Sequence, residues 1–225
     1  MGLPKEAIET AIELDYLDGM KSANKALDIA KYYLSINEIE NTLKWISISA
    51  DRGFQNYFVF DKYDFYKTLR GDKRLDALLD RMKENVGIGK PTQPFTRTDL
   101  AGQVISPEKY LGKVLLIDFW ATWCLPCLAE IPILKKHYTE FHGKGFEIIG
   151  ISLDQDKEKL DKYLLENKIE WPIVFGGKGW QDETKEMFGV KNIPASWLID
   201  KKGVVRYFCL KGVDLRNAII ELMNE

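Results

Sequence analysis

The chain has 225 residues, of which 45% are apolar and 29% charged, a composition typical of folded globular proteins. Its net charge of −2 provides no basic surface for nucleic acid or for an anionic membrane, so we expect neither as a partner. No apolar run approaches the roughly 18 residues of a membrane-spanning helix, so we expect no membrane span in this chain.

The N-terminus shows no secretory signal, because the first six residues lead directly into a charged sequence with helical spacing. This pattern is typical of a cytosolic protein, and equally of a protein whose leader has been removed or replaced. The compartment therefore stays open at this point.

The first 88 residues have helical spacing and no convincing strand alternation. Gly19 is predicted to separate the first two helices, Asn37 to cap the third and Gly53 to end it. The apolar faces of the four predicted helices are Ala7, Ala11 and Leu14; Ala23, Ala26, Leu27 and Ala30; Ile39, Leu43, Ile46 and Ala50; and Leu75, Leu78, Leu79 and Met82.

Seven aromatic residues lie between positions 54 and 66. We interpret them first as packing between helix pairs and, as the alternative, as the lining of a peptide-binding groove. Segments 43–54 and 69–75 resemble the end of a tetratricopeptide-like array, which implies helical hairpins and leaves room for a protein partner. Fewer than three repeats are visible, so we expect this region to depend on docking to its neighbour for stability.

Residues 87–94 contain two glycines and two prolines, which cannot continue a helix. We therefore place the domain boundary here, with an all-α helical region over residues 1–88 and a second domain over residues 89–225.

The second domain alternates strands and helices after a short hairpin over residues 95–105. Strands are predicted at 114–120, 146–153, 171–175, 196–199 and 204–210, and helices at 126–142, 154–167, 182–188 and 214–223. Asp154 is expected to cap the second of these helices and Pro132 to kink the first. The order predicts an α/β fold with a mixed central sheet flanked by helices on both faces.

Cys124 and Cys127 stand two residues apart where the helix after the first buried strand should begin. The thiolate is the reactive form of cysteine, and a helix N-terminus stabilises negative charge. Cys127 returns to the same helical face and can close a small disulfide with Cys124. The pattern predicts a redox dithiol, with Cys124 as the exposed nucleophile and Cys127 as the buried resolving thiol. The third cysteine, Cys209, is predicted to be a buried apolar side chain in a strand.

Four phrases make residues 89–225 resemble the thioredoxin-fold domains of TlpA-like thiol–disulfide oxidoreductases. They are Leu111-Gly112-Lys113-Val114, Phe119-Trp120-Ala121-Thr122-Trp123-Cys124-Leu125-Pro126-Cys127, Glu130-Ile131-Pro132 and Gly189-Val190-Lys191-Asn192-Ile193-Pro194. The resemblance implies reduction or isomerisation of protein disulfides through a mixed disulfide, in an extracytoplasmic compartment (periplasmic or at the cell surface).

The resemblance also implies a substrate-binding surface around the dithiol. It implies that Pro194 is cis and that the backbone of Ile193 pairs with an extended substrate. Trp123, Leu125 and Pro126 are expected to complete this surface.

Asp118 and Glu130 are the candidate bases for Cys127. The resemblance places Asp118 where thioredoxins have a buried acid, and Glu130 where TlpA-like proteins often have one. Thioredoxins commonly pair the buried acid with a lysine of the next strand, where this chain has Gly150. In an apolar site without a cation, we expect a raised pKa for Asp118 and a coupled acid pair with one member titrating near neutral pH. The alternative for Glu130 is a position on a solvated helix surface.

The expected partners are a protein disulfide substrate and a thiol electron donor, with no cofactor besides the dithiol. Leu125 gives the thiolate neither a charge nor a hydrogen-bond donor, so we expect a reductant or isomerase rather than a strong oxidant. His137 and His142 have no ligand-like company, and a single C-x-x-C lacks the second pair of a structural zinc site, so no metal is predicted.

Two other functions stay open. A peroxiredoxin-like peroxidase needs a threonine three residues before its reactive cysteine, where this chain has Ala121, with Thr122 one residue late. A redox-sensing binding module would instead use the helical region to recruit a partner and would turn over disulfides slowly.

Overall fold

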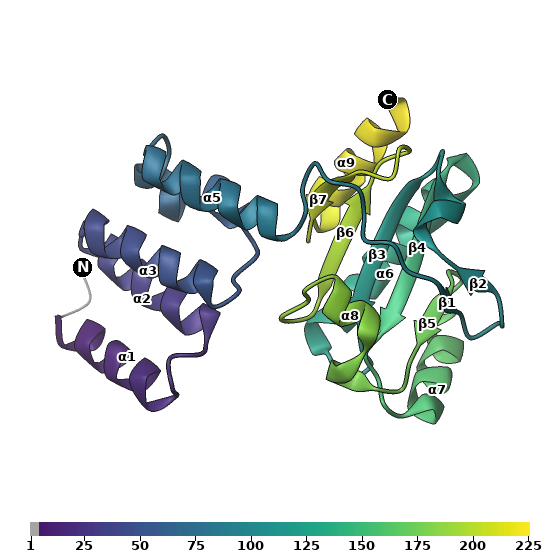
Figure 1. Cartoon of the computed structure of the whole chain (residues 1–225), viewed down its shortest axis with the longest axis horizontal. Helices are drawn as coiled ribbons and strands as arrows, with labels where there is room; N and C mark the ends of the chain where they lie inside the picture. The colour runs from purple at the N-terminus through teal and green to yellow at the C-terminus, as the bar shows by residue number, and fades with distance from the viewer. Residues whose placement is uncertain (1–4) are drawn as a thin grey trace. The chain divides into compact units, whose positions relative to one another are not determined.

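The computed structural model describes residues 5–225, and the chain forms two compact units, the first ending at Val86 and the second spanning Gly87–Glu225 (Figure 1). The predicted boundary after residue 88 lies close to this division. Residues 1–4, which belong to the predicted helical region, lie outside the described residues.

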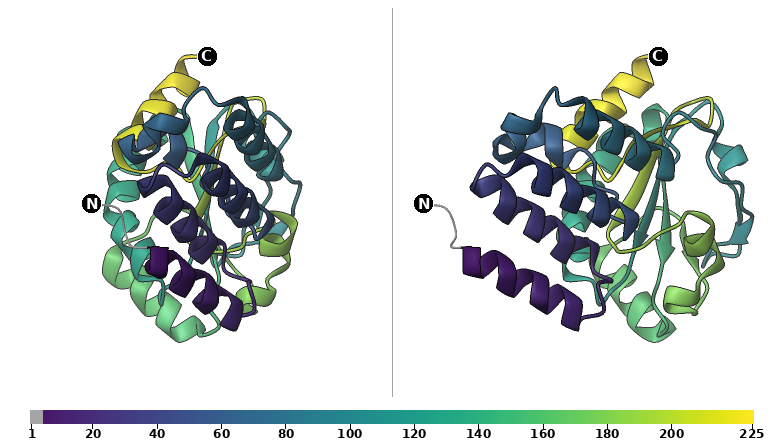
Figure 2. Two further views of the ribbon diagram at one scale, coloured as in Figure 1. Left: turned by 90° about the vertical axis from the view of Figure 1, so that its left-hand side faces the viewer. Right: turned by 60° about the vertical axis from the view of Figure 1, so that its left-hand side comes forward.

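The first unit is entirely helical. Its elements are α1 (Lys5–Leu17), α2 (Ala23–Ser35), α3 (Ile39–Asp51), α4 (Val59–Lys62), the 3-10 helix η1 (Asp64–Leu69) and α5 (Lys73–Asn85). Helices α1, α2 and α3 lie side by side in both views of Figure 2, and α2 packs against both neighbours. Ser22 and Asp72 cap α2 and α5 by accepting backbone hydrogen bonds, which explains where these helices begin.

The inward face of α1 differs from the predicted one. Ile8 and Asp15 are buried, whereas Leu14 of the predicted face is 54% exposed. The reason is an ion pair in which Arg52 Nη1, just after α3, lies 2.7 Å from Asp15 Oδ1. A buried carboxylate needs such a partner, so α1 turns Asp15 inward and Leu14 outward.

The two predicted ends of α3 had different outcomes. Gly53 ends α3 as predicted, with a positive φ of 96°. The predicted cap at Asn37 is wrong, because Asn37 takes the left-handed conformation that closes α2 and donates its N–H to Leu34. Glu38 occupies the capping position of α3 instead.

The aromatic segment both packs and lines a groove. Phe54, Phe60 and Tyr66 are buried in the helical core, with ring centroids of Phe60 and Tyr66 4.7 Å apart. Tyr63 and Phe65 are exposed at a groove of about 580 Å³ on the same unit. The packing interpretation is confirmed, and the groove remains available to a ligand.

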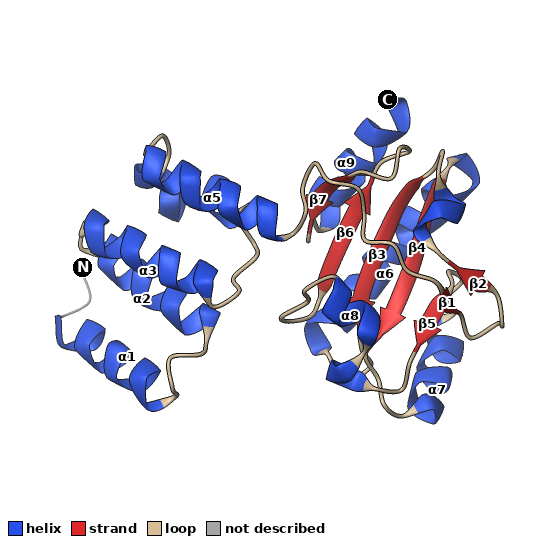
Figure 3. Cartoon of the chain, viewed as in Figure 1, coloured by secondary structure: helices blue, strands red, loops and turns tan. Residues whose placement is uncertain are grey.

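The second unit is built on a five-stranded mixed sheet in the order β5-β4-β3-β6-β7 (Figure 3). The strands are β3 (Val114–Trp120), β4 (Phe146–Ser152), β5 (Ile173–Phe175), β6 (Ala195–Ile199) and β7 (Val205–Phe208). β3 and β5 run parallel to β4, while β6 runs antiparallel to β3 and β7. The helices are α6 (Leu125–Phe141), α7 (Lys157–Asn167), α8 (Glu183–Met187) and α9 (Gly212–Asn224).

This architecture confirms the predicted α/β fold. All seven residues of β3 are buried, as expected for a central strand with helices on both faces. In the view of Figure 3, α6 lies behind the sheet and α8 in front of it. Short 3-10 segments, η2 (Pro107–Tyr110), η3 (His142–Lys144) and η4 (Gly179–Gln181), connect these elements.

The predicted linker is tied into the second unit. Gly89 N–H donates to Val205 O at 2.8 Å, and Val205 N–H donates to Lys90 O at 2.9 Å. The chain then forms the predicted hairpin, β1 (Arg97–Thr98) with β2 (Val104–Ile105), and Leu100 N–H donates to Ile173 O of β5. Residues 89–100 therefore reach both edge strands of the sheet.

A second predicted helix cap, Asp154, is also wrong. Asp156, not Asp154, caps α7 by accepting a hydrogen bond from Lys159 N. Asp154 is buried, and its carboxylate is used at the candidate active site.

Candidate active site

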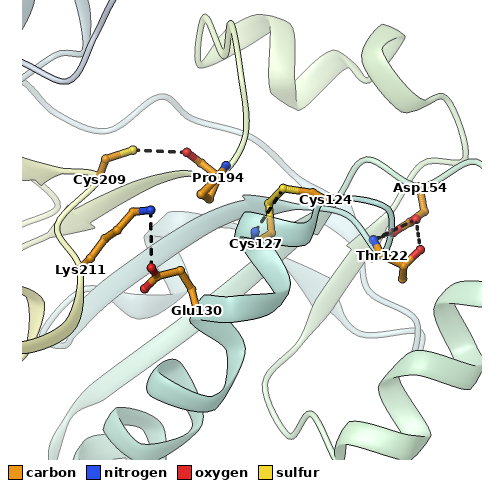
Figure 4. Close-up of a disulfide and its surroundings, with 8 residues drawn as sticks. All are labelled: Thr122, Cys124, Cys127, Glu130, Asp154, Pro194, Cys209 and Lys211. Carbon is orange, nitrogen blue, oxygen red and sulfur yellow. Dashed lines mark hydrogen bonds and ion pairs between the residues drawn. A yellow bond between two sulfur atoms is a disulfide. The ribbon is translucent and has the colours of Figure 1, made fainter.

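Cys124 and Cys127 form a disulfide at the N-terminus of α6 (Figure 4). Cys124 is the N-cap residue, and its sulfur accepts a hydrogen bond from Cys127 N at 3.2 Å. Pro126 stands in the first turn, where its missing N–H leaves no helical hydrogen bond unmade. The helix therefore begins just after Cys124, where its N-terminal partial charge can stabilise the thiolate that forms when the disulfide is reduced.

The surface around the disulfide is apolar. Cys124, predicted to be exposed, is only 5% exposed because its sulfur is bonded to that of Cys127. The flanking side chains are open, with Trp123 52% and Leu125 77% exposed. Trp180 of η4, which the sequence did not single out, extends this surface, since its ring centroid lies 6.2 Å from that of Trp123.

The Ile193–Pro194 peptide bond is cis, as predicted. Pro194 lies beside the disulfide in Figure 4, and its carbonyl oxygen lies 3.6 Å from the sulfur of Cys209. Cys209 was predicted within a strand, but β7 ends at Phe208 and Cys209 has a positive φ of 54°. Burial raises the pKa of Cys209 to about 12, so this thiol is protonated next to the dithiol.

Asp118 lies in the middle of β3 and is 7% exposed. Burial first, and then the negative charge of Glu130, raise the pKa of Asp118 to about 7, while Lys211 lowers it. This value agrees with the predicted titration near neutral pH.

Gly150 is the β4 partner of Asp118, as predicted from the sequence. A Cβ atom at Gly150 would lie 2.6 Å from Ile173 Cδ1 and 3.2 Å from Trp120 Nε1. A lysine at this position would therefore have to displace Ile173 and Trp120.

The expectation of a site without a cation is wrong. Lys211, in the connection between β7 and α9, places its Nζ 3.5 Å from Glu130 Oε1. The Glu130 side chain is 22% exposed and paired, so it is not simply on a solvated helix surface. Sequence spacing could not reveal Lys211, because only the fold brings it to α6.

Asp154 organises the loop that precedes Cys124. Its carboxylate accepts hydrogen bonds from the hydroxyl of Thr122 at 2.6 Å, from Thr122 N and from the hydroxyl of Ser152 at 2.8 Å. Figure 4 shows Thr122 turned toward Asp154. Because the Thr122 hydroxyl has one proton and gives it to Asp154, it cannot also donate to a peroxide at Cys124.

The two histidines serve structural contacts. His137 Nε2 lies 3.1 Å from Gly212 O, and His142 Nδ1 lies 3.1 Å from Glu147 Oε2. Burial lowers the pKa of His137, so this imidazole is neutral at pH 7. Over residues 5–225, the structure groups no three metal-ligating side chains, and no helix is both long and apolar enough to cross a membrane.

The match to a known protein family falls within the second unit. A family model described as the AhpC/TSA family matches residues 88–208. The thiol-disulfide oxidoreductase ResA of Bacillus thuringiensis subsp. konkukian (strain 97-27) is 33% identical over 123 residues, which cover 55% of this chain and 69% of that protein. ResA of Geobacillus thermodenitrificans (strain NG80-2) is 32% identical over 124 residues, covering 55% and 70%.

Solved structures with similar folds carry related names. The thioredoxin domain of a thiol-disulfide oxidoreductase from Bacteroides vulgatus has a TM-score of 0.56 at 33% identity, covering 61% of this chain and 98% of that one. A thiol:disulfide interchange protein from Bacteroides sp. has a TM-score of 0.56 at 32% identity, covering 63% and 93%. The helical unit lies outside the family match.

Proposed function

Because the chain belongs to the AhpC/TSA family of thioredoxin-fold proteins, we propose that it reduces or isomerises protein disulfides with the Cys124–Cys127 dithiol. The class, a thiol–disulfide oxidoreductase, is the one its relatives are named for, and it confirms the prediction from sequence. The observation that carries the proposal is the pair of sulfurs at the N-terminus of α6, with a buried carboxyl group in the strand that leads to it.

The first chemical step is attack by the Cys124 thiolate on one sulfur of a substrate disulfide. A bond forms between Cys124 Sγ and that sulfur, the substrate disulfide breaks, and the departing sulfur leaves as a thiolate that takes a proton. The N-terminus of α6 favours the thiolate of Cys124 before attack.

The second step is resolution of the mixed disulfide. The Cys127 thiol gives its proton to the carboxylate of Asp118 and attacks Cys124 Sγ, which forms the disulfide seen here and releases the reduced substrate. Two electrons pass from the dithiol to the substrate. A thiol donor returns the enzyme to its reduced form by the reverse exchange, so no cofactor is needed.

Substrate is proposed to lie on the apolar surface formed by Trp123, Leu125 and Pro126, with the backbone of Ile193 pairing to an extended chain before cis-Pro194. Leu125 supplies neither charge nor donor to the thiolate, which favours a reductant or isomerase. We place the activity in an extracytoplasmic compartment by analogy with the TlpA-like thiol–disulfide oxidoreductases. We also assign a protein partner to the helical unit, because this unit has an open aromatic groove.

The test is mixed-disulfide trapping combined with insulin reduction. Cys127→Ser should accumulate a covalent adduct with a disulfide substrate, because Cys124 still attacks but nothing resolves it. Cys124→Ser should form no such adduct and should lose insulin reduction. If Cys124→Ser reduces insulin at the wild-type rate, the proposed function is wrong.

The peroxidase alternative predicts a different result with the same variant. Cys127→Ser would then consume peroxide faster than free thiol does. We expect no such acceleration, because Ala121 occupies the position of the needed threonine and the Thr122 hydroxyl donates to Asp154. A sensor would show slow insulin turnover in the wild type while still forming the disulfide.

A further inference from the structure

A cation lies beneath the dithiol in addition to the two acids. Lys211 Nζ is 3.5 Å from Glu130 Oε1, and Figure 4 shows the two side chains pointing toward each other, with Glu130 below Cys127 and Lys211 to its left. Lys211 is also the residue that precedes α9, so its backbone is fixed by the start of that helix. Its side chain is half-exposed, which leaves the ammonium group solvated on one side.

The fold brings Lys211 to Asp118 through paired strands. Asp118 of β3 is the register partner of Ser196 in β6, and Ser196 O accepts a hydrogen bond of 2.7 Å from Cys209 N. Lys211 follows Cys209 by two residues. From the other side, Glu130 lies in α6 one turn after Cys127. Three elements thus converge on Asp118.

The other groups around these side chains do not replace the cation. The β4 and β6 partners of Asp118 are Gly150 and Ser196, which carry no charge. Cys209 is a protonated thiol, and His137 on α6 is held neutral at pH 7 by burial. Among the described residues, the charges that act on Asp118 are therefore those of Glu130 and Lys211.

We propose that Lys211 is a positioning residue of the resolving step, which pairs with Glu130 and offsets its negative charge so that Asp118 can ionise and accept the proton of Cys127. This inference rests on the proposed function. It adds that Lys211 regulates the second step, in which Cys127 resolves the mixed disulfide. The Lys211–Glu130 pair differs from an ordinary surface ion pair in two ways. Glu130 lies in the first turns of α6, the helix that begins after Cys124, and Asp118, the group on which the pair acts, is buried.

The sign of the effect follows from the two opposing charges. Lys211 lowers the pKa of Asp118, whereas Glu130 raises it. Removing Lys211 leaves two carboxyl groups without their cation, so a higher pH is needed to ionise Asp118. Removing the charge of Glu130 acts in the opposite direction, and removing both should leave Asp118 near its original behaviour.

The experiment follows one turnover of the reduced full-length chain with dipyridyl disulfide. Attack by Cys124 releases one pyridinethione, and resolution by Cys127 releases the second, so the two steps appear as two absorbance phases. The rate of each phase is measured against pH for wild type, Lys211→Met, Glu130→Gln, the double variant and Lys211→Arg. Lys136→Met, an exposed lysine of the same helix as Glu130, is the control with the same change in net charge.

Lys211→Met should move the midpoint of the second phase to higher pH by roughly half a pH unit or more, since a full charge is lost close to a buried acid. Glu130→Gln should move it to lower pH, the double variant should return toward wild type, and Lys211→Arg should restore it. The first phase and the Lys136→Met variant should keep the wild-type profile.

A second-phase midpoint that stays in place in Lys211→Met would overturn the inference, as would an equal shift in Lys136→Met. A merely structural role would slow the phases without moving the midpoint in opposite directions for the two charge changes. Failure of the proposed function is a separate result, in which the wild type releases one pyridinethione and no second phase.

Discussion

Asp118 lies in the middle of β3, and the fold raises its pKa to about 7. The free energy of unfolding therefore depends on the protonation of this carboxyl group. The unfolded chain releases this proton near the ordinary value of 3.8. Between these two values the folded state holds a proton that the unfolded state has lost. The free energy of unfolding contributed by Asp118 is therefore fully present below about pH 4 and is lost as the pH rises to about 7.

Asp118→Asn should remove this dependence, because the amide has nearly the shape of the neutral acid. We expect the oxidised variant to be more stable than wild type at about pH 8, by on the order of 4 kcal/mol at most, and the difference to vanish toward about pH 4. Thermal unfolding across this pH range measures it. Asp76→Asn, at an exposed carboxylate of α5, should leave the curve in place. A variant that parallels the wild-type curve would contradict the raised pKa of Asp118.

Asp154 should matter for both stability and rate, because its carboxylate holds Thr122 two residues before Cys124. Asp154→Ala leaves buried donors unpaired, which costs roughly 1–3 kcal/mol per group, and it loosens the loop that positions the nucleophile. We expect lower thermal stability together with slower insulin reduction.

Asp156→Ala is the matched control for Asp154→Ala. It removes the cap of α7 at a cost of about 1 kcal/mol and should leave the rate of insulin reduction unchanged. Equal activity in the two variants would show that Asp154 does not position Cys124.

Among the residues of the candidate site, those that stand in a local sequence motif could be predicted from the sequence. Cys124, Cys127 and Pro194 stand in phrases that can be read along the chain. Lys211 and Asp154 could not be found in that way, because Glu130 and Thr122, which link them to the active site, lie far away in sequence. The carboxylate of Asp154 was assigned to a local helix cap, the usual use of an aspartate at that place.

The bounds of a helix or strand are predicted best from the sequence where burial alone determines them. β3 has its predicted bounds, Val114–Trp120, since a run buried on both faces has little freedom in its limits. Helix ends are less predictable because several polar residues compete for one capping position, as at Asn37 and Glu38 or at Asp154 and Asp156. The face of α1 depended on Arg52, a contact that periodicity cannot include.

At Gly150 in β4, the packing of Ile173 from β5 limits the size of the side chain. A methyl group there would meet Ile173 and Trp120 at distances shorter than ordinary contact. We expect Gly150→Ala to lower the free energy of unfolding by about 1–3 kcal/mol, the usual cost of overfilling a packed core. Chemical denaturation measures this value.

Gly143→Ala provides the control, because a Cβ atom at Gly143 meets open space and its φ is not positive. It should unfold at the wild-type denaturant concentration. If Gly150→Ala also does so, the sheet adapts at this point and β4 is not as tightly packed against β5 as the structure indicates.

The molecule as a whole consists of two units, and the composition of residues 87–94 indicated a boundary at this place. It did not indicate that the same residues pair with β7, because glycine and proline suggest an unpaired connection. The helical unit is less constrained by sequence, since its resemblance to tetratricopeptide-like arrays covers few residues. The groove of this unit is a feature of the structure, and the protein partner that we assign to it is a proposal.

A chain that begins at Gly87 should keep insulin reduction, whereas a chain that begins at Pro94 should be less stable. The shorter chain loses the hydrogen bonds of Gly89, Lys90 and Thr92 to the β7 region, each worth about 0.5–1.5 kcal/mol. Thermal unfolding and insulin reduction of the two chains test this. Equal melting temperatures would show that these bonds do not stabilise the second unit.

Residues 89–100 also determine whether the edges of the sheet can pair with another chain. β5 and β7 are its two edge strands, and each receives backbone hydrogen bonds from this one segment, at Leu100 and at Gly89. Unpaired strand edges are templates for adding another chain, and proteins commonly cover them. Proteolytic removal of residues 89–100 would uncover both edges together, and we expect the trimmed protein to self-associate before its core unfolds.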